Sequence, residues 1–290
     1  MSEGNTGDGG GKEFERVASA LRARMAGGTY PENSLLPAQR ELAKEFGVSR
    51  DTVQRVLREL AAEGWIVSRQ GSGSRVIRVQ RIHSPTSGKQ PDRMVTLRPL
   101  IDQAFEQPEV TLDVFTLTSE SLDTHIRLQA ERIRQREITP RSINLRMLLP
   151  DESLAPPYWR TENGAHDELL RARYLAISRR HTVSLRSVLR SLEVEGLVSS
   201  VDVTFRRVEL MPQAKLYLLN GREAVYGPYQ VYRRPILLDD GQEIAGALDV
   251  VGLGAGLTHH VKDDDPFAPG TVFVDSMQQW FDSVWELLSA

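Results

Sequence analysis

The segment at residues 48–76, VSRDTVQRVLRELAAEGWIVSRQGSGSRV, constrains the fold of this chain more than any other stretch. Ser49 stands where a serine can cap a helix. Asp51 falls in the first turn, where the helix dipole favours negative charge. The apolar residues that follow recur at the spacing of one buried helix face: Val53, Val56, Leu57 and Leu60. The segment therefore predicts an amphipathic helix that ends near Gly64.

The rest of the segment predicts a short hairpin. Residues 65–67 and 75–77 are strand-like and flank residues 70–73, Gln-Gly-Ser-Gly. The glycines allow a tight turn and a close approach of the backbone to a phosphate. A helix with a solvated polar face, followed by a glycine-tipped hairpin, is the order of a recognition helix and its wing. This order predicts double-stranded DNA as a partner.

Two further helices are expected upstream. The spacing of Phe14, Val17, Leu21 and Met25 predicts a first helix that ends near residues 27–28, Gly-Gly.

Pro37 fits a first helical turn, so residues 38–46 predict a second helix, which Gly47 ends. Residues 1–11 are glycine-rich and are expected to be disordered. Residues 12–82 then form a winged helix-turn-helix module.

The charge of the chain is unevenly distributed. The whole sequence has a formal net charge of −3, but residues 12–81 hold 13 Lys and Arg against 8 Asp and Glu. This segment is therefore net +5, and the remainder of the chain is net −8. A basic module attached to an acidic body supports nucleic acid as the partner of the module alone.

Residues 30–76 resemble the DNA-binding domain of the GntR family of bacterial repressors. The resemblance covers about a quarter of the chain and lies in the Leu-Pro helix start, the Leu-Ala pair, Gly-Val-Ser-Arg, Thr-Val and the Gly-x-Gly wing. It implies base or phosphate contacts by Arg40 and Arg50, a phosphate contact by Thr52, and a wing tip at residues 71–73. The full candidate DNA-binding set is Arg40, Ser49, Arg50, Asp51, Thr52, Gln54, Arg55, Gln70, Gly71, Ser72 and Gly73.

The module departs from the family pattern at three positions. Ala38 and Gln39 stand where the family has serine and glutamate, and Gln54 stands where relatives often have arginine. Glutamine can bond adenine with two hydrogen bonds, whereas arginine favours guanine. The operator of this protein is therefore not expected to follow the common operators of the family.

Residues 83–97 lack periodicity and predict an exposed linker, and residues 98–290 predict a second domain. Strand-like segments lie at 111–118, 142–150, 197–210, 215–220, 224–233 and 243–251, and helical ones at 122–138, 169–192 (in two pieces) and 275–288. This alternation indicates an α/β layered domain. The fold class is thus α/β and multi-domain, with a winged helix-turn-helix followed by an α/β effector-binding and dimerisation domain.

Residues 211–229 have the spacing of a phospholipase D motif, His-x-Lys followed by four residues and an acid. Gln213, Lys215 and Asn220 occupy those positions. The C-terminal domain thus resembles a degenerate phospholipase D-like sensor domain, and these three residues are candidate ligand contacts. The alternative is a β-hairpin in an unrelated α/β sensor domain, such as a chorismate-lyase-like one.

The same motif argues against catalysis. Gln213 cannot attack phosphorus, and Asn220 cannot act as the carboxylate. A second copy at residues 260–262, His-Val-Lys, fails because Phe267 occupies the acidic position. The protein is therefore not expected to be an enzyme.

Other features exclude further chemistry. The chain has no cysteine, so neither disulfides nor thiolate metal sites can form. His259 and His260 precede three aspartates that are typical of a solvated loop, and the GLGAG run at 252–256 lacks a full dinucleotide fingerprint. No cofactor or metal is expected. Without a signal peptide or a long apolar run, the cytoplasm is the expected location.

Three functions follow from these expectations. The first is a ligand-responsive transcriptional repressor that binds a pseudo-palindromic operator as a homodimer and senses an unidentified small molecule. The second is a phosphodiesterase or nuclease of phospholipase D-like type, targeted to DNA. The third is a DNA-binding scaffold without a ligand.

Overall fold

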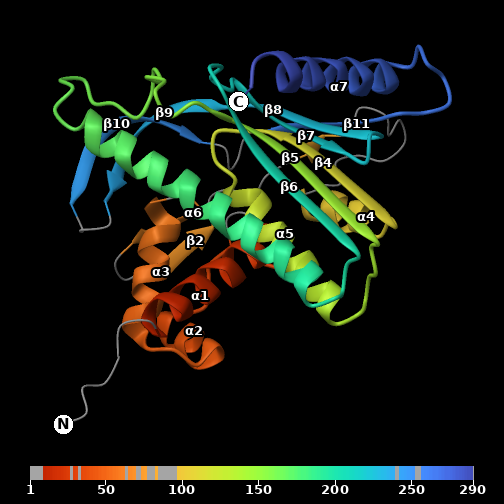
Figure 1. Ribbon diagram of the computed structural model, residues 1–290. Coiled ribbons are helices and arrows are strands. Elements are labelled where there is room, and N and C mark those ends of the chain that lie inside the picture. The colour runs from red at the N-terminus through yellow and green to blue at the C-terminus, as the bar shows by residue number, and fades with distance from the viewer. Residues whose placement is uncertain are drawn as a thin grey trace, which may run out of the picture. The chain divides into compact units, whose positions relative to one another are not determined.

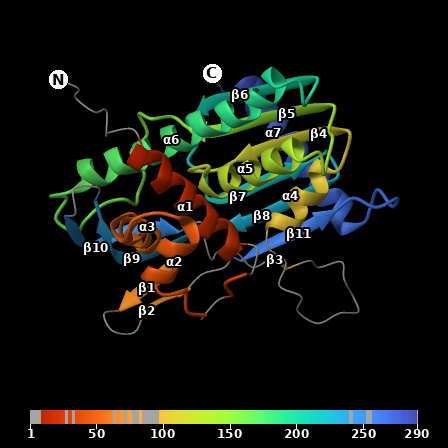
Figure 2. The same ribbon diagram turned by 90° about the horizontal axis from the view of Figure 1, so that it is seen from below.

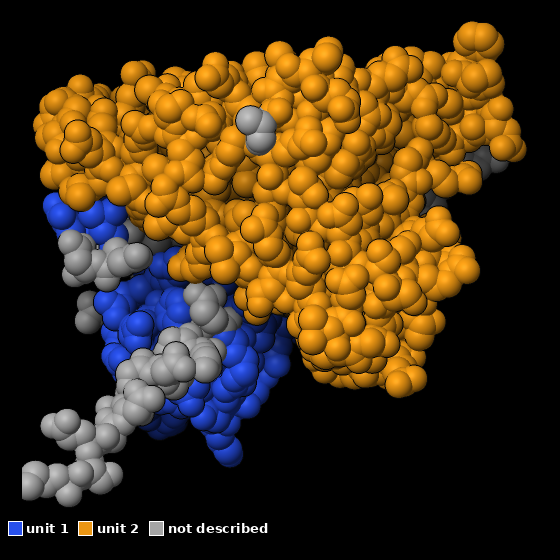
Figure 3. Space-filling model, in the orientation of Figure 1, with its two compact units in different colours: residues 1–79, 235–245 blue, residues 80–234, 246–290 orange. Residues whose placement is uncertain are grey.

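The structure is a computed structural model of the 290-residue chain. It describes residues 9–26, 29–31, 34–62, 65–69, 73–76, 82–83, 97–238, 242–251 and 256–289. The chain divides into two compact units, residues 1–79 with 235–245 and residues 80–234 with 246–290 (Figure 3). These are the N-terminal and C-terminal units below.

The N-terminal unit contains three helices, α1 (Gly9–Ala26), α2 (Gln39–Phe46) and α3 (Arg50–Ala62) (Figure 1). Their apolar faces form one core, which includes the buried residues Val17, Leu21, Met25, Leu42, Val53, Val56, Leu57 and Leu60. The helical spacing read from the sequence is therefore confirmed for α1 and α3. Helix α1 begins at Gly9, three residues inside the segment 1–11 expected to be disordered, because extending an existing helix costs little compared with nucleating one.

The ends of α2 and α3 follow ordinary capping rules. The Ser49 hydroxyl accepts a hydrogen bond from the Thr52 backbone N–H at 3.0 Å, so the predicted cap of α3 is confirmed. Gly47 ends α2 with a left-handed φ of 64°. At the start of α2, Ala38 donates its backbone N–H to the Glu41 carboxylate at 3.0 Å. Pro37 lies before this cap rather than in the first turn as predicted, because the helix starts at Gln39.

A two-stranded antiparallel sheet follows α3. Strand β1 (Ile66–Arg69) pairs with β2 (Gly73–Val76), with Ile66 opposite Val76 and Arg69 opposite Gly73. Trp65, Ile66 and Val76 are buried against the helices. The predicted hairpin is therefore confirmed. Of its expected tip, residues 71–73, only Gly73 belongs to the described residues, and it begins β2.

The C-terminal unit is built on a seven-stranded mixed sheet. Its strands, in spatial order, are β3 (Ile82–His83), β11 (Leu257–Val261), β8 (Glu223–Pro228), β7 (Ala214–Leu219), β4 (Glu109–Phe115), β5 (Ser142–Pro150) and β6 (Ser200–Val208). Strands β4, β5 and β6 are parallel. Strand β7 runs antiparallel to β4 and to β8, and β8 runs antiparallel to β11. Strands β9 (Gln230–Leu237) and β10 (Glu243–Val251) form a separate two-stranded sheet.

Helices cover both faces of the large sheet (Figures 1 and 2). Helices α4 (Leu97–Phe105), α5 (Glu120–Arg134) and α6 (Asp167–Val194) share a core with one face, which includes Tyr217 and Leu219 of β7. Helix α7 (Pro269–Leu287) packs on the other face, with Phe281 and Trp285 against Leu216 and Leu218 of β7. Alternate residues of β7 thus face opposite helices, as the pleat of a strand requires.

Three details of the sequence prediction need correction. Residues 167–194 form one helix rather than two, because one continuous buried stripe from Leu170 to Leu192 holds α6 against the core. The strand expected at 224–233 is two strands that break at Tyr229. Strand β11, which includes His259 and His260, was not predicted; it pairs with β8, and His259 reaches the Glu223 carboxylate of that strand at 2.7 Å.

Candidate nucleic-acid interface

Helix α3 presents a polar face opposite its buried stripe. The residues exposed on this face are Arg50, Asp51, Gln54, Arg55 and Arg58. They recur at intervals of three and four positions, so they form one continuous surface along the helix. A helix of this width fits the major groove of DNA, where side chains can reach the edges of the bases.

Two arginines of the candidate set are available to an incoming phosphate or base. Arg40 at the start of α2 and Arg50 at the start of α3 are both exposed. Neither forms an ion pair with a residue in the described part of the chain. Arg55 differs, because its guanidinium lies 5.3 Å from the centre of the Phe14 ring and packs against α1. Arg40 and Arg50 are therefore the stronger candidates for contacts with DNA.

Thr52 serves the cap of α3. Its side chain is buried, and its hydroxyl lies 2.9 Å from the Ser49 hydroxyl. The phosphate contact that the family resemblance implies would need this hydroxyl to be shared with the cap.

The hairpin of the wing pairs with a third segment, residues 34–36, which the sequence did not predict. The Leu36 N–H donates to the Ser74 carbonyl at 2.8 Å, and the Val76 N–H donates to the Ser34 carbonyl at 2.9 Å. The segment before α2 thus fixes strand β2 against the helices. Gly73 has a left-handed φ of 79°, which explains why glycine stands where the turn enters β2. Gln70, Gly71 and Ser72 of the candidate set lie outside the described residues.

Arg24 positions α2 from α1. Its guanidinium forms an ion pair with Glu45, donates to the Tyr30 hydroxyl at 3.1 Å and lies 5.0 Å from the centre of the Phe46 ring. The hydrogen bond with Glu45 raises the pKa of Arg24 above its ordinary value. This long-range clamp has no signature in the local sequence pattern, because Glu45 and Phe46 belong to α2 whereas Arg24 belongs to α1.

The N-terminal unit has three helices, and the third is capped and exposes a polar face. An antiparallel hairpin follows this helix in the chain. This combination defines a winged helix-turn-helix module. Comparison with known proteins agrees with this class. Residues 14–76 match the family profile described as bacterial regulatory proteins, gntR family. The N-terminal module is therefore a GntR-type helix-turn-helix domain.

Similar curated proteins share this module. The HTH-type transcriptional regulator TreR of Bacillus subtilis (strain 168) is 28% identical over 133 residues, which are 43% of this chain and 54% of that protein. The histidine utilization repressor of Pseudomonas putida is 37% identical over 68 residues, 23% of this chain and 27% of that protein. The chain thus spans about half of TreR and less of the repressor. Both relatives are named as regulators and neither as an enzyme.

Similar solved structures add little about the second domain. A GntR family transcriptional regulator from Listeria monocytogenes is 26% identical and covers 22% of this chain and 56% of its own, with a TM-score of 0.22. TrmBL2, an archaeal chromatin protein, covers 95% of this chain and 92% of its own at 11% identity, with a TM-score of 0.27. Scores this low establish no shared fold, so the phospholipase D-like resemblance of the C-terminal domain stays a prediction.

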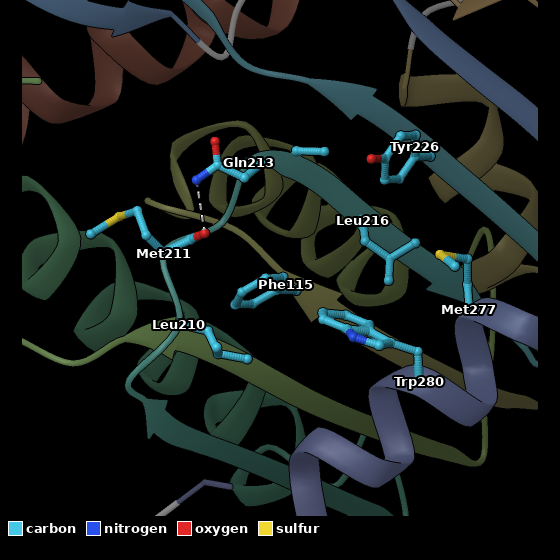
Figure 4. Close-up of a pocket in the computed structure, with 9 residues that line it drawn as sticks. Phe115, Leu210, Met211, Gln213, Leu216, Tyr226, Met277 and Trp280 are labelled. Atoms are coloured by element: carbon cyan, nitrogen blue, oxygen red, sulfur yellow. Dashed lines mark hydrogen bonds between the residues drawn. The ribbon is translucent and has the colours of Figure 1, made fainter. Parts of the chain in front are cut away.

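The three candidate ligand residues of the C-terminal domain are not brought into one site. Gln213 lies just before β7 and lines an apolar pocket of about 400 Å³ together with Phe115, Leu216 and Trp280 (Figure 4). Lys215 lies only two positions after Gln213, but it is buried on the opposite face of β7. Its neighbours Ala214 and Leu216 line the pocket, and adjacent residues of a strand point to opposite faces.

Asn220 is at the far end of β7 and has a role in the turn to β8. Its side-chain oxygen accepts from the Thr111 N–H at 2.8 Å, and its amide donates to the Ala104 carbonyl at 3.0 Å. Its φ of 51° and that of Gly221, 62°, are left-handed. An Asn-Gly pair between two strands is itself a hairpin signal, so the sequence already carried this second interpretation.

No group of three or more His, Cys, Asp or Glu that could hold a metal ion occurs within the described ranges. His259 bonds Glu223, while the ring of His260 stacks on that of Phe273 with centres 3.8 Å apart.

No helix in the described part of the chain is long and apolar enough to cross a membrane.

Proposed function

We propose that this protein is a DNA-binding transcriptional regulator whose N-terminal module reads a pseudo-palindromic operator as part of a homodimer. The C-terminal domain senses a small molecule and thereby changes operator binding. Repression is the proposed output, and no catalytic activity is assigned.

The observation that carries this proposal is the polar face of α3. Arg50, Gln54 and Arg58 are exposed on one side of a helix whose other side is buried. The wing lies directly after this helix in the chain, and the match to the gntR family covers both. Such a helix contacts base edges while flanking basic groups contact phosphates.

The dimer follows from the geometry of this class of module. One module covers one half-site, and two half-sites about one helical turn apart give the affinity and the symmetry of an operator. Linkage then allows a ligand of the C-terminal domain to change DNA affinity, provided that it binds the two arrangements of the dimer unequally.

The test is selection of bound duplexes from a random DNA pool with the purified full-length protein. An inverted repeat is expected, and sedimentation of the complex should give two chains per duplex. Recovery of DNA without any shared sequence would contradict the proposal.

Replacing Arg50 by alanine is expected to weaken binding to the selected operator by about 10- to 100-fold and to change binding to unrelated DNA much less, because a base contact is worth about 1–3 kcal/mol. Arg40→Ala should weaken both to a similar extent, as loss of a phosphate contact does. Fluorescence anisotropy with labelled duplexes measures both affinities.

Arg190→Ala is the matched control for these two variants, because it removes an exposed arginine of α6 in the C-terminal unit. Its operator affinity should equal that of the wild type. If Arg40→Ala and Arg50→Ala also bind normally, α3 does not enter the groove in the proposed way.

Replacing Gln54 by arginine is expected to move the preferred base at one position of each half-site from adenine to guanine. The discrimination should change by about 10- to 100-fold, since glutamine bonds adenine and arginine bonds guanine with two hydrogen bonds. Selection repeated with Gln54→Arg reports the new preference. An unchanged consensus would show that Gln54 does not contact a base.

A further inference from the structure

Lys215 is a buried lysine that has no ion-pair or hydrogen-bond partner in the described part of the chain. Its residue is 5% exposed, and its ammonium forms no hydrogen bond or ion pair with any residue that the structure describes. The nearest ring is that of Tyr229, whose centre is 6.0 Å from the ammonium nitrogen. Burial lowers the pKa of Lys215 to about 8, while Glu120 opposes this shift. Buried lysines are rare unless they are paired, so this one calls for an explanation.

Other buried polar atoms of the same unit also lack hydrogen-bond partners. Six such side-chain atoms occur in the described part of the chain, and all but the Trp65 indole nitrogen belong to the C-terminal unit: Ser119 Oγ, His125 Nδ1, Tyr158 OH, Ser178 Oγ and His181 Nε2. Each of these five residues is at most 5% exposed. Buried hydroxyls and imidazoles are normally satisfied, so a group of unsatisfied ones indicates an absent partner.

Hydrogen bonds join side chains of α6 and of Tyr229 to the connection between β4 and α5. The Tyr229 hydroxyl accepts from the Leu117 N–H at 2.9 Å and lies 2.8 Å from the Thr116 hydroxyl. The Tyr174 hydroxyl, on α6, donates to the Leu117 carbonyl at 3.2 Å. The connection from β4 to α5 is thus held by side chains from α6 and from the end of β8.

Lys215 and Tyr158 reach the same connection. Lys215 pairs with Gly227 of β8. The next residue of β7, Leu216, pairs with Phe115 at the end of β4, so Lys215 lies beside the start of the β4–α5 connection. The charge of Glu120 in the first turn of α5 acts on both Lys215 and Tyr229, and the proximity of Tyr158 raises the pKa of Tyr229 further.

The place where these groups meet is the carboxyl edge of parallel strands. The β4–α5 connection leaves the end of β4, and Tyr158 lies in the loop that follows the parallel strand β5. In α/β sheets this edge is where ligands bind. The N-terminus of α5 also lies at this edge. Ser119 is the N-cap residue of α5, but its hydroxyl forms no capping hydrogen bond. Helix N-termini favour anions.

The carboxylates nearby are already engaged. Asp123 lies 2.9 Å from His181 Nδ1 and also accepts from the Ser184 hydroxyl. Burial raises the pKa of Asp123, but the hydrogen bond and charge of His181 outweigh this effect, so the net shift of the pKa is downward. Glu120 accepts from the Thr118 hydroxyl at 3.1 Å. Neither carboxylate is within ion-pair distance of Lys215.

We propose that Lys215, Ser119, Tyr158, Ser178 and His181, the Lys215 cluster, bind the phosphate or carboxylate group of the small molecule that the C-terminal domain senses. An anion would pair with the ammonium and accept hydrogen bonds from the hydroxyls, and it would lie at the N-terminus of α5. The cluster replaces Gln213 and Asn220 as the ligand site. The inference rests on the proposed function only in assigning a sensory role to the anion.

The test uses inorganic phosphate and acetate as probes of the full-length protein, with potassium chloride at equal ionic strength as the reference. Thermal unfolding and isothermal titration calorimetry are measured on wild type, Lys215→Met and Lys262→Met. Methionine keeps the length and bulk of lysine without its charge. Lys262 is the matched control because it is a lysine of the same unit that already has a partner, Asp275.

At least one probe is expected to stabilise the wild type and Lys262→Met, and the probe that does so identifies a phosphate or a carboxylate ligand. Lys215→Met should bind it about 10- to 100-fold more weakly, the loss expected for a hydrogen bond to a charged group. Without a probe, Lys215→Met should melt no lower than the wild type, because it removes an unpaired buried charge. If Lys215→Met does not fold, the double variant Ser119→Ala with Ser178→Ala provides the same comparison.

The proposal is overturned if neither probe binds the wild type, or if Lys215→Met binds as tightly as Lys262→Met. DNA binding by the same preparations is measured separately. Failure to select an operator would contradict the proposed function and leave the anion measurement intact, so the two failures are distinguishable.

Discussion

Raising the salt concentration from about 50 to about 200 mM is expected to weaken binding of the selected operator by about 1000-fold. Each phosphate that an arginine or lysine neutralises releases condensed counterions, so the logarithm of the affinity falls linearly with the logarithm of the salt concentration. Three phosphate contacts per module, two of them by Arg40 and Arg58, would give about six per dimer and a slope near −5. Anisotropy titrations at several salt concentrations measure this slope.

The slope also tests the assignment of individual contacts. Arg40→Ala should make it less steep by about 2, because a dimer loses two phosphate contacts. Arg190→Ala, which changes charge only in the C-terminal unit, should leave it unchanged. A loss of affinity below about 10-fold over the same salt range would mean that the module contacts few phosphates, and the proposed groove-bound arrangement would fail.

Replacing Phe281 by alanine is expected to lower the free energy of unfolding of the C-terminal domain by about 3–5 kcal/mol. Phe281 lies on α7, is 0% exposed and packs into the core formed with β7. Its ring stacks against Trp285 with centres 5.9 Å apart, and the Arg146 guanidinium lies 5.2 Å from it. Alanine would remove these contacts and leave a cavity that the sheet cannot fill by moving.

Urea unfolding followed by tryptophan fluorescence measures this loss, since Trp280 and Trp285 lie on the same helix as Phe281. Phe267→Ala is the matched control, because Phe267 is 85% exposed and its replacement should change stability by less than about 0.5 kcal/mol. A loss below about 1 kcal/mol for Phe281→Ala would show that α7 does not complete the core of the domain.

The N-terminal module could be predicted almost completely because its signals are local. Ser49 caps α3 through an N–H three residues away, and Gly47 ends α2 through its own backbone freedom. The buried stripe of α3 is a property of helical spacing alone. The sequence did not predict the pairing of residues 34–36 with β2 or the contacts of Arg24 with α2. Both depend on partners from distant positions.

The C-terminal domain could be predicted only in outline. Strand β5 was predicted with its bounds, Ser142–Pro150, because Ile143, Leu145 and Met147 alternate with polar residues. The candidate ligand set was drawn from spacing within one segment, and spacing does not say which face of a strand a residue occupies or whether an asparagine belongs to a turn. Gln213 and Asn220 have ordinary structural partners, whereas Lys215 has none in the described part of the chain.

The sequence by itself therefore determined the class of the DNA-binding module, since capping, helical periodicity and a glycine turn are interactions between near neighbours in the segment at residues 48–76. Only the tertiary structure decided which polar residues of the C-terminal domain are buried without a hydrogen-bond partner among the described residues. Ser119, Tyr158, Ser178 and Lys215 come from four separate segments. The packing of α5 and α6 against one face of the sheet is what buries them without partners, and burial is the physical reason that they call for a ligand.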